Sequence, residues 1–232
     1  MKNIWNCTIE TVAQQDLDDS LIGGIPKLPP ELSIPTCTLC SQKMSFMFQV
    51  AFPKGHIWEG KTLALFYCLD CFGHQFCIPE IPTGSSLYHV EIPDGFLDSY
   101  QRNFRVIVFD TADGVLLKND CERVAFRKIE FHLSDKNDKD AIFTFGGKPI
   151  WVMGKNETPG NYATTEKLKL LFQIKEGFQF PKCENAPPQA SGFYPDKRSP
   201  FPWYDLFARN RIYFWGTDAR KDAKVYISVQ HG

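Results

Sequence analysis

The sequence Cys37-Thr-Leu-Cys40 is followed, after 27 intervening residues, by Cys68-Leu-Asp-Cys71. Each C-x-x-C pair closes a tight turn that points two sulfurs inward, and the intervening residues are enough for a β-hairpin that brings both turns together. This spacing predicts a four-thiolate Zn²⁺ site with Cys37, Cys40, Cys68 and Cys71 as ligands. Four thiolates leave no open position for water, so we expect the ion to be structural and not catalytic.

The second cysteine pair continues into Cys71-Phe-Gly-His74-Gln-Phe-Cys77, which offers two further metal-binding side chains. A second ion needs four ligands, and His74 and Cys77 supply only two. We therefore favour a buried apolar thiol at Cys77 over a second metal site. The role of His74 stays open.

Two blocks of sequence recur with an offset of 123 to 124 residues. Ile22-Gly-Gly-Ile-Pro26 is similar to Phe145-Gly-Gly-Lys-Pro149, and Lys43-Met-Ser-Phe-Met-Phe-Gln-Val50 is similar to Lys167-Leu-Lys-Leu-Leu-Phe-Gln-Ile174. Self-similarity at a fixed offset is typical of repeated supersecondary units. We predict an internal duplication, with a first copy over residues 1–140 and a second copy over residues 141–232 in one compact unit.

The two predicted copies differ at the metal site. At an offset of 124, Cys37 and Cys40 correspond to Asn161 and Thr164, so the second copy lacks the thiol pair. The zinc site therefore belongs to the first copy, and the fold of a copy does not depend on metal.

Composition and patterning predict an α+β fold that is rich in β-strands. Phe and the other aromatic residues make up 14% of the chain, and 16 Gly with 16 Pro provide many turns. Gln49 and Gln173 lie within apolar strands, where we expect each side chain to hold a neighbouring loop. Thr8 to Asp18 is the best candidate helix. The expected strands are Met44 to Ala51, Thr62 to Tyr67, Leu87 to Ile92, Arg105 to Thr111, Glu122 to His132, Leu168 to Ile174, Arg211 to Trp215 and Val225 to Gln230.

Charge and hydropathy exclude several functional classes. The 26 basic residues nearly balance the 27 acidic residues, which gives no support to nucleic-acid binding by bulk charge. No apolar run approaches the ~18 residues of a membrane span, and the N-terminus lacks the apolar run of a signal peptide. We expect a cytoplasmic protein with no membrane partner, whose cysteines stay reduced.

The sequence contains no recognisable catalytic constellation, since none of its five histidines lies in a Ser/His/Asp or Cys/His context. An aromatic cluster occurs at Pro200-Phe-Pro-Trp203-Tyr-Asp-Leu-Phe207. If exposed, Trp203, Tyr204 and Phe207 would form a protein-binding surface, because such side chains dominate interface energies. The alternative is that they anchor a loop in the core.

Several of these motifs occur in the same order in a known family. The chain resembles the YwqG-like family of bacterial proteins over residues 20–70 and 143–230. In the first half the resemblance is carried by Ile22-Gly-Gly-Ile-Pro26, Pro35-Thr-Cys-Thr-Leu-Cys40 and Met44-Ser-Phe-Met-Phe-Gln49. In the second half it is carried by Gly146-Gly-Lys-Pro-Ile-Trp151, Glu157-Thr-Pro159, Leu171-Phe-Gln-Ile174, Arg211-Ile-Tyr-Phe-Trp215 and Val225-Tyr-Ile-Ser-Val-Gln230. YwqG-like domains also occur beside bacterial toxin genes, as some immunity proteins do.

The first half also resembles the programmed-cell-death-protein-two family, which has a Gly-Gly-x-Pro turn, a C-x-x-C turn and an apolar-Gln strand. That family is associated with chaperoning a ribosomal protein of the small subunit, which implies a β-rich cradle for a protein segment. This chain lacks the further cysteine-rich turns of the family. Neither resemblance supplies catalytic residues.

We therefore expect a non-enzymatic, zinc-stabilised protein-binding module that acts as an immunity protein against a toxin or as a chaperone-like protein for a ribosomal-protein client. The alternative is an enzyme or small-ligand binder with its site in a cleft between the two copies, since interfaces between duplicated halves are favoured pocket locations.

Overall fold

The computed structural model describes residues 3–71, 78–82, 89–117, 122–152, 156–191, 194–218 and 223–231. The chain is β-rich, with 40% of residues in strands and 5% in helices, and its main feature is one large, nearly closed antiparallel sheet. Within the described residues, no helix has the length and apolar character needed to span a membrane.

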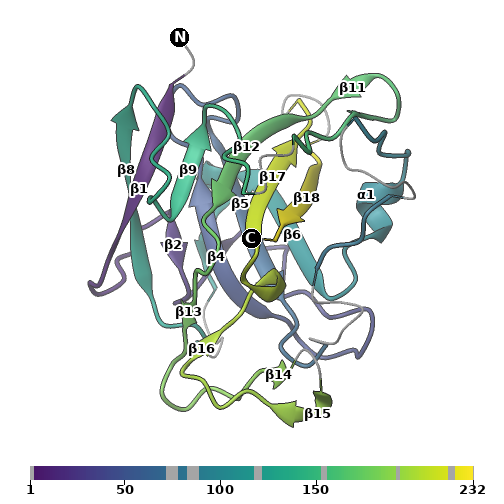
Figure 1. Cartoon of the computed structure of the whole chain (residues 1–232). Helices are drawn as coiled ribbons and strands as arrows, with labels where there is room; N and C mark the ends of the chain where they lie inside the picture. The colour runs from purple at the N-terminus through teal and green to yellow at the C-terminus, as the bar shows by residue number, and fades with distance from the viewer. Residues whose placement is uncertain are drawn as a thin grey trace.

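The large sheet has ten strands in the order β18-β17-β12-β9-β1-β8-β2-β4-β5-β6 (Figure 1). These strands are β1 Ile4–Glu10, β2 Leu21–Ile22, β4 Ser45–Ala51, β5 Lys61–Tyr67, β6 Phe104–Asp110, β8 Arg127–Ser134, β9 Phe143–Gly146, β12 Lys169–Ile174, β17 Arg211–Gly216 and β18 Val225–Gln230.

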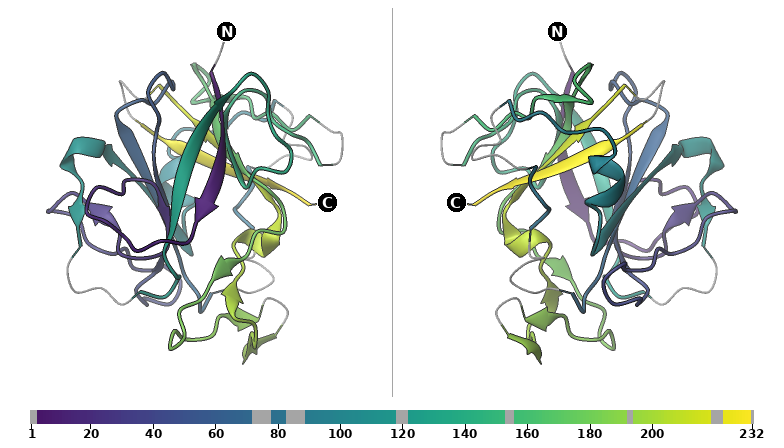
Figure 2. Two further views of the ribbon diagram at one scale, coloured as in Figure 1. Left: turned by 90° about the vertical axis from the view of Figure 1, so that its left-hand side faces the viewer. Right: turned by 90° about the vertical axis from the view of Figure 1, so that its right-hand side faces the viewer.

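Among the described residues, short two-stranded sheets and three short helices flank the large sheet. The strand pairs are β3 Lys27–Leu28 with β7 Val115–Leu116, β10 Asn161–Tyr162 with β11 Glu166–Lys167, β13 Phe180–Pro181 with β16 Trp203–Tyr204, and β14 Ala190–Ser191 with β15 Tyr194–Arg198. The helices are α1 Phe96–Ser99 and the 3₁₀-helices η1 Thr111–Asp113 and η2 Phe207–Arg209. The pair β13 and β16 and the pair β14 and β15 form an arm that projects from one end of the molecule (Figure 2).

The expected helix at Thr8 to Asp18 is wrong. Its first residues belong to β1, in which Trp5 and Cys7 point into the core with a period of two, and residues 11–18 form an irregular connection. Other differences are smaller. The strand expected at Glu122 to His132 begins only at Arg127. Residues 87 and 88 lie outside the described residues, and residues 89–92 contribute only an isolated bridge between Ile92 and Tyr162.

β1 and β8 lie at the centre of the sheet and join strands from the two parts of the chain. β1 pairs with β8 from Ile4 opposite Ser134 to Glu10 opposite Lys128, and its other edge pairs with β9. β8 in turn pairs with β2. The large sheet therefore runs without interruption through strands from residues 1–140 and from residues 141–232.

The segment that contains α1 lies beside β6 and β18, the two ends of the sheet (Figure 1). The hydroxyl of Tyr100 donates to the carbonyl oxygen of Val225 and accepts from the amide of Ile227, both at 3.0 Å. The Oε1 atom of Gln101 accepts from the amide of Val106 at 2.7 Å. Two consecutive side chains thus hydrogen-bond to both edge strands.

The concave side of the sheet is filled mainly by aromatic rings. Phe172 stacks on Phe214 with ring centroids 4.1 Å apart and on Phe145 at 4.9 Å. Phe48 from β4 contacts the same cluster, including Phe172 at 6.1 Å and Phe214 at 5.9 Å. One core therefore unites both parts of the chain, because aromatic burial is a major source of packing energy.

A second, smaller core covers the other face of β4, β5 and β6. It includes Leu28, Ile34, Phe46 and Phe66, and also the thiols Cys37 and Cys68.

The prediction that Gln49 holds a neighbouring loop is confirmed. Its Oε1 accepts from the amide of Lys27 at 2.8 Å, and its Nε2 donates to the carbonyl of Asp19 at 3.1 Å.

Gln173 has the corresponding role on β12. Its Oε1 accepts from the amide of Ile150 at 2.9 Å, and its Nε2 donates to the carbonyl of Lys148 at 3.2 Å. Each glutamine holds the chain that follows a Gly-Gly turn. The turn glycines have positive φ, 56° and 67° at Gly23 and Gly24 and 67° and 66° at Gly146 and Gly147, a conformation that costs little without a Cβ atom.

Candidate metal centre

The first pair of cysteines lies in a tight turn before β4. The turn is closed by a bridge between Thr36 and Lys43, by the amide of Cys37 donating to the carbonyl of Gln42 at 2.9 Å, and by the amide of Ser41 donating to Cys37 at 2.9 Å. Ser41 has a left-handed φ of 61°, which reverses the chain immediately after Cys40.

The second pair begins where β5 ends, and a neighbouring segment joins the two turns. The amide of Cys68 donates to the carbonyl of Asn103 at 2.8 Å, and the amide of Thr38 donates to the carbonyl of Arg102 at 3.1 Å. Residues 102 and 103 therefore contact both cysteine turns. The second turn follows directly on β5, which sets its position.

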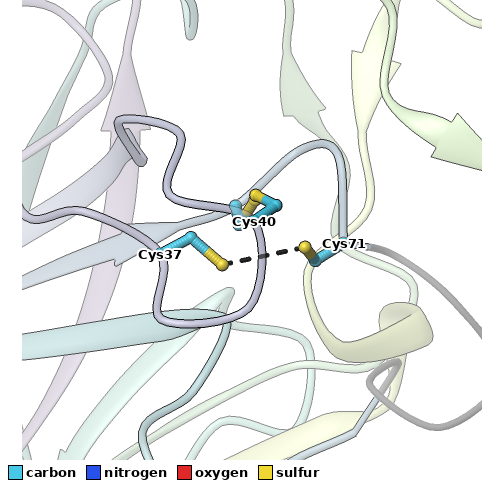
Figure 3. Close-up of side chains that lie close together, drawn as sticks. Cys37, Cys40 and Cys71 are labelled. Atoms are coloured by element: carbon cyan, nitrogen blue, oxygen red, sulfur yellow. Dashed lines mark hydrogen bonds between the residues drawn. The ribbon is translucent and has the colours of Figure 1, made fainter.

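The structure brings the four predicted thiols together. Their sulfur atoms all lie within 4.8 Å of one another, with 3.7 Å between Cys37 and Cys71 and 3.5 Å between Cys40 and Cys68. Figure 3 shows the sulfurs of Cys37 and Cys71 turned toward each other from the two turns. Tetrahedral coordination with Zn–S bonds near 2.3 Å places sulfurs about 3.8 Å apart, so the group matches the size of a four-thiolate zinc site.

Burial and mutual proximity shift the pKa values of the thiols. Burial raises the pKa of Cys68 to about 12, and burial followed by the neighbouring thiols raises the pKa of Cys71. Burial acts to raise the pKa of Cys40 as well, but the Gln42 backbone amide and the adjacent thiols outweigh it, and that pKa is lowered. Four thiolates held this close together would require a compensating positive charge.

The cysteine turns also hold the arm, which comprises residues 178–191 and 194–206. Between Cys68 and Cys71, the carbonyl of Leu69 accepts from the amide of Ala190 at 2.8 Å. Beside it, Asp70 forms an ion pair with Arg198 at 2.6 Å. The second cysteine turn is therefore the attachment point of an element that lies more than 100 residues later in the sequence.

The predicted aromatic surface is corrected in part. Tyr204 and Phe207 are completely buried, so neither can touch a partner in this fold. The Tyr204 hydroxyl donates to the carbonyl of Pro187 at 2.6 Å, and Phe207 packs its ring against Tyr67 and Phe104. They anchor the arm because their backbone runs back into the sheet at this point.

Trp203 and its neighbour Phe201 remain at the surface of the arm. Phe201 is 49% exposed, and its ring stacks on the half-buried Trp203 with a centroid distance of 4.7 Å and an interplanar angle of 7°. His74 and Cys77 lie outside the described residues, so the alternatives for their roles stand as predictions. Cys183 is half-buried and lies apart from the thiol group.

Sequence reasoning did not locate a cavity of about 390 Å³ between the connection from β4 to β5 and the strands β1, β9, β12 and β17. His56 in its wall is buried and holds this connection in place. Its Nδ1 accepts from the Trp58 amide at 3.1 Å, which leaves Nε2–H to donate to the carbonyl of Leu171 at 3.1 Å. Burial lowers the pKa of His56 to about 4, although the bond to Leu171 opposes the shift.

The fold and the site define a β-rich protein whose four gathered cysteines could hold a metal ion. No protein-family model and no curated protein matches this chain.

Proposed function

We propose that this protein is a non-enzymatic protein-binding module of the cytoplasm, stabilised by Zn²⁺ bound to Cys37, Cys40, Cys68 and Cys71. The observation that carries the proposal is the attachment of the arm, with its stacked pair of Phe201 and Trp203, to the cysteine turn at Leu69 and Asp70. The metal would then hold a binding surface in position without taking part in chemistry.

Zinc is supported by the donor set and by its geometry. Four sulfurs at tetrahedral spacing suit a borderline-soft ion, whereas Ca²⁺ and Mg²⁺ prefer oxygen ligands. Four thiolates complete the coordination shell, so the ion would have no position at which to activate water. Cys37 and Cys68 are 1% exposed, which also protects their sulfurs from competing ligands.

The binding surface consists of Phe201 and Trp203. Stacked aromatic rings on a projecting element form a flat, rigid apolar contact, and ordering such side chains on binding costs little entropy. Their arm is rigid because Gln189 bonds to the backbone of Asp205 twice, with Nε2 to oxygen at 2.9 Å and Oε1 to the amide at 2.8 Å. The surface is therefore preorganised before a partner arrives.

The two resemblances suggest the class of partner. The YwqG-like resemblance favours a toxin, which this protein would neutralise as an immunity protein. The programmed-cell-death-protein-two resemblance favours a ribosomal-protein client, which it would sequester as a chaperone does. Both partners are proteins, and both would be held in a stoichiometric complex.

Affinity capture from the native host tests the proposal. Tagged wild-type protein, Phe201→Ser and Trp203→Ser are compared with Leu133→Ser, which removes a 69% exposed apolar side chain from β8. We expect wild type and Leu133→Ser to retain one stoichiometric protein, and the two arm variants to lose it. The purified pair should then elute as a one-to-one complex on gel filtration. Capture of no tight partner by the wild type, or equal capture by all four proteins, would reject the proposal.

We further infer that the chain arose by internal duplication, and the strand registers support this. Leu21 lies opposite Gln49 in β2 and β4, and Thr144 lies opposite Gln173 in β9 and β12. The register of β4 against β5 shifts after Phe46, and that of β12 against β17 shifts after Leu170, which is 124 residues later. The two predicted copies meet where β1 of the first pairs with β9 of the second.

The position that corresponds to the first cysteine turn contains Asn161 and Thr164. A short hairpin forms there without thiols, with Asn161 opposite Lys167. The same turn is thus built with and without cysteines, which supports a stabilising role for the metal in one copy. The second candidate function, a ligand site between the copies, is favoured by the cavity beside His56.

A further inference from the structure

The cavity between the connection from β4 to β5 and the strands β9, β12 and β17 has the size of a small-molecule site. Its volume of about 390 Å³ lies within the ~300–1,000 Å³ range that is usual for ligand pockets. Its walls include Trp5, Leu168 and Trp215, which are at most 6% exposed and present apolar surface. Such walls suit the flat face of an aromatic or other planar group.

The charged groups that line the cavity are donors of hydrogen bonds. Lys167 and Lys169 contribute to its lining, and neither forms an ion pair in the described part of the chain. The Trp5 indole N–H also donates no hydrogen bond to a described residue. None of the described residues that line the cavity is acidic. The nearest carboxylate that the structure ties to the lining is that of Glu59, which accepts from the amide of Gly55 at 2.7 Å. The two ammonium groups of the lining itself favour an anion at this opening.

We propose that this cavity binds a small organic anion with a flat apolar body, such as an aromatic carboxylate, sulfonate or phosphate ester. Lys167 and Lys169 contact the anionic group, and the two tryptophans contact the apolar body. Lysine suits this role because its ammonium group is a mobile point charge that adapts to differently shaped anions.

The site is preorganised by hydrogen bonds, two of which join the two halves of the chain. His56 donates to Leu171 O, and the Trp58 indole donates to the carbonyl of Thr217 at 2.9 Å. The Trp215 indole donates to the Ser228 hydroxyl at 2.8 Å. The walls formed by His56 and Trp215 are thereby fixed before binding, which reduces the entropy that a ligand must offset.

Fluorescence titration of the full chain with 8-anilinonaphthalene-1-sulfonate tests the proposal, because this probe combines a planar apolar body with one negative charge. N-phenyl-1-naphthylamine has the same body without the charge, and inorganic phosphate has the charge without the body. We expect saturable one-to-one binding of the sulfonate, weaker binding of the neutral amine, and no competition by phosphate at equal concentration.

Charge variants locate the site. Replacing both cavity lysines, as Lys167→Gln with Lys169→Gln, should weaken binding of the sulfonate about tenfold or more, since charge-assisted hydrogen bonds are lost. Lys139→Gln makes the same chemical change at an exposed lysine outside the cavity and should leave binding unchanged. Ile57 is 49% exposed at the cavity wall, so Ile57→Glu should oppose the anion while Ile57→Gln does so far less.

These substitutions lie at exposed positions, and a thermal melt verifies that each variant remains folded. Binding that is absent in the wild type, equal for the neutral and charged probes, or unchanged in the double lysine variant would overturn the proposal. Equal binding by Ile57→Glu and Ile57→Gln would overturn it as well.

Discussion

His56 donates a hydrogen bond from Nε2 to the carbonyl oxygen of Leu171, 115 residues away, at 3.1 Å. The bond joins the connection after β4 to the irregular residue of β12, at the point where its register against β17 shifts. The Trp58 amide uses Nδ1 of the same ring, so both nitrogens are satisfied only in the neutral form. The imidazole is therefore a neutral structural link between the two parts of the chain.

The first prediction concerns acid stability. An unfolded histidine has a pKa near 6.5, and that of His56 in the folded chain is about 4, so the unfolded chain binds more protons between these values. The stabilisation that neutral His56 contributes is fully present above pH 6.5. It decreases by about 3 kcal/mol as the pH falls toward 4. Urea unfolding from pH 7 to 4 should show a steeper loss for wild type than for His56→Gln.

The control is His132→Gln, which changes an exposed histidine of β8. Its pH dependence should follow the wild type. Parallel stability curves for wild type and His56→Gln would show that the buried ring does not titrate as stated.

The second prediction concerns the metal. Cys40→Ser breaks a four-thiolate shell and should release zinc, lowering the free energy of unfolding by about 4 kcal/mol or more. Elemental analysis and a thermal melt measure both effects. Cys183→Ser removes a thiol outside the cluster and should retain one zinc per chain. Wild-type protein that contains no zinc when purified without chelator would contradict the prediction.

The third prediction concerns the arm. If zinc holds the turn that contains Leu69, a chelator should accelerate hydrogen exchange of the Ala190 amide, which is bonded to that carbonyl. The Ile227 amide, bonded to Tyr100 in the opposite part of the sheet, should exchange at the same rate with and without chelator. Equal acceleration at both amides would indicate global unfolding and not release of the arm.

The fourth prediction concerns the paired glutamines. Gln49→Met should leave the Lys27 amide and the Asp19 carbonyl without their hydrogen-bond partner. Gln173→Met should do the same to the Ile150 amide and the Lys148 carbonyl. Each change should cost about 2–4 kcal/mol in chemical denaturation, because two backbone groups lose their partners. Gln15→Met, at an exposed position, should cost little. A duplicated fold requires similar losses at both sites, so a large loss at only one of them would count against it.

Local pattern was enough to predict much of the β-structure. The strands near Met44 to Ala51, Thr62 to Tyr67 and Leu168 to Ile174 are confirmed because each is a continuous apolar run between turn residues. The four clustered thiols followed from their spacing alone. The helix expected at Thr8 to Asp18 took in only the last residues of β1, a strand whose neighbours β8 and β9 come more than 115 residues later.

The remaining features depend on contacts that sequence spacing does not reveal. The cavity draws Trp5, Ile57, Lys167 and Trp215 from four segments that are far apart in the sequence. In the sequence, Tyr204, Phe207 and Trp203 are equivalent aromatic residues of one short segment. Only the path of the backbone decides that two of these rings enter the core while the third stays near the surface.

The hydrogen bonds of Tyr100 and Gln101 have a consequence for the behaviour of the protein at high concentration. A sheet with two free margins invites other chains to add strands, which is a common origin of fibrils and insoluble deposits. Here neighbouring side chains already engage Val225 and Ile227 on one margin and Val106 on the other. The short segment after α1 thereby occupies backbone groups on both margins that an added strand would need.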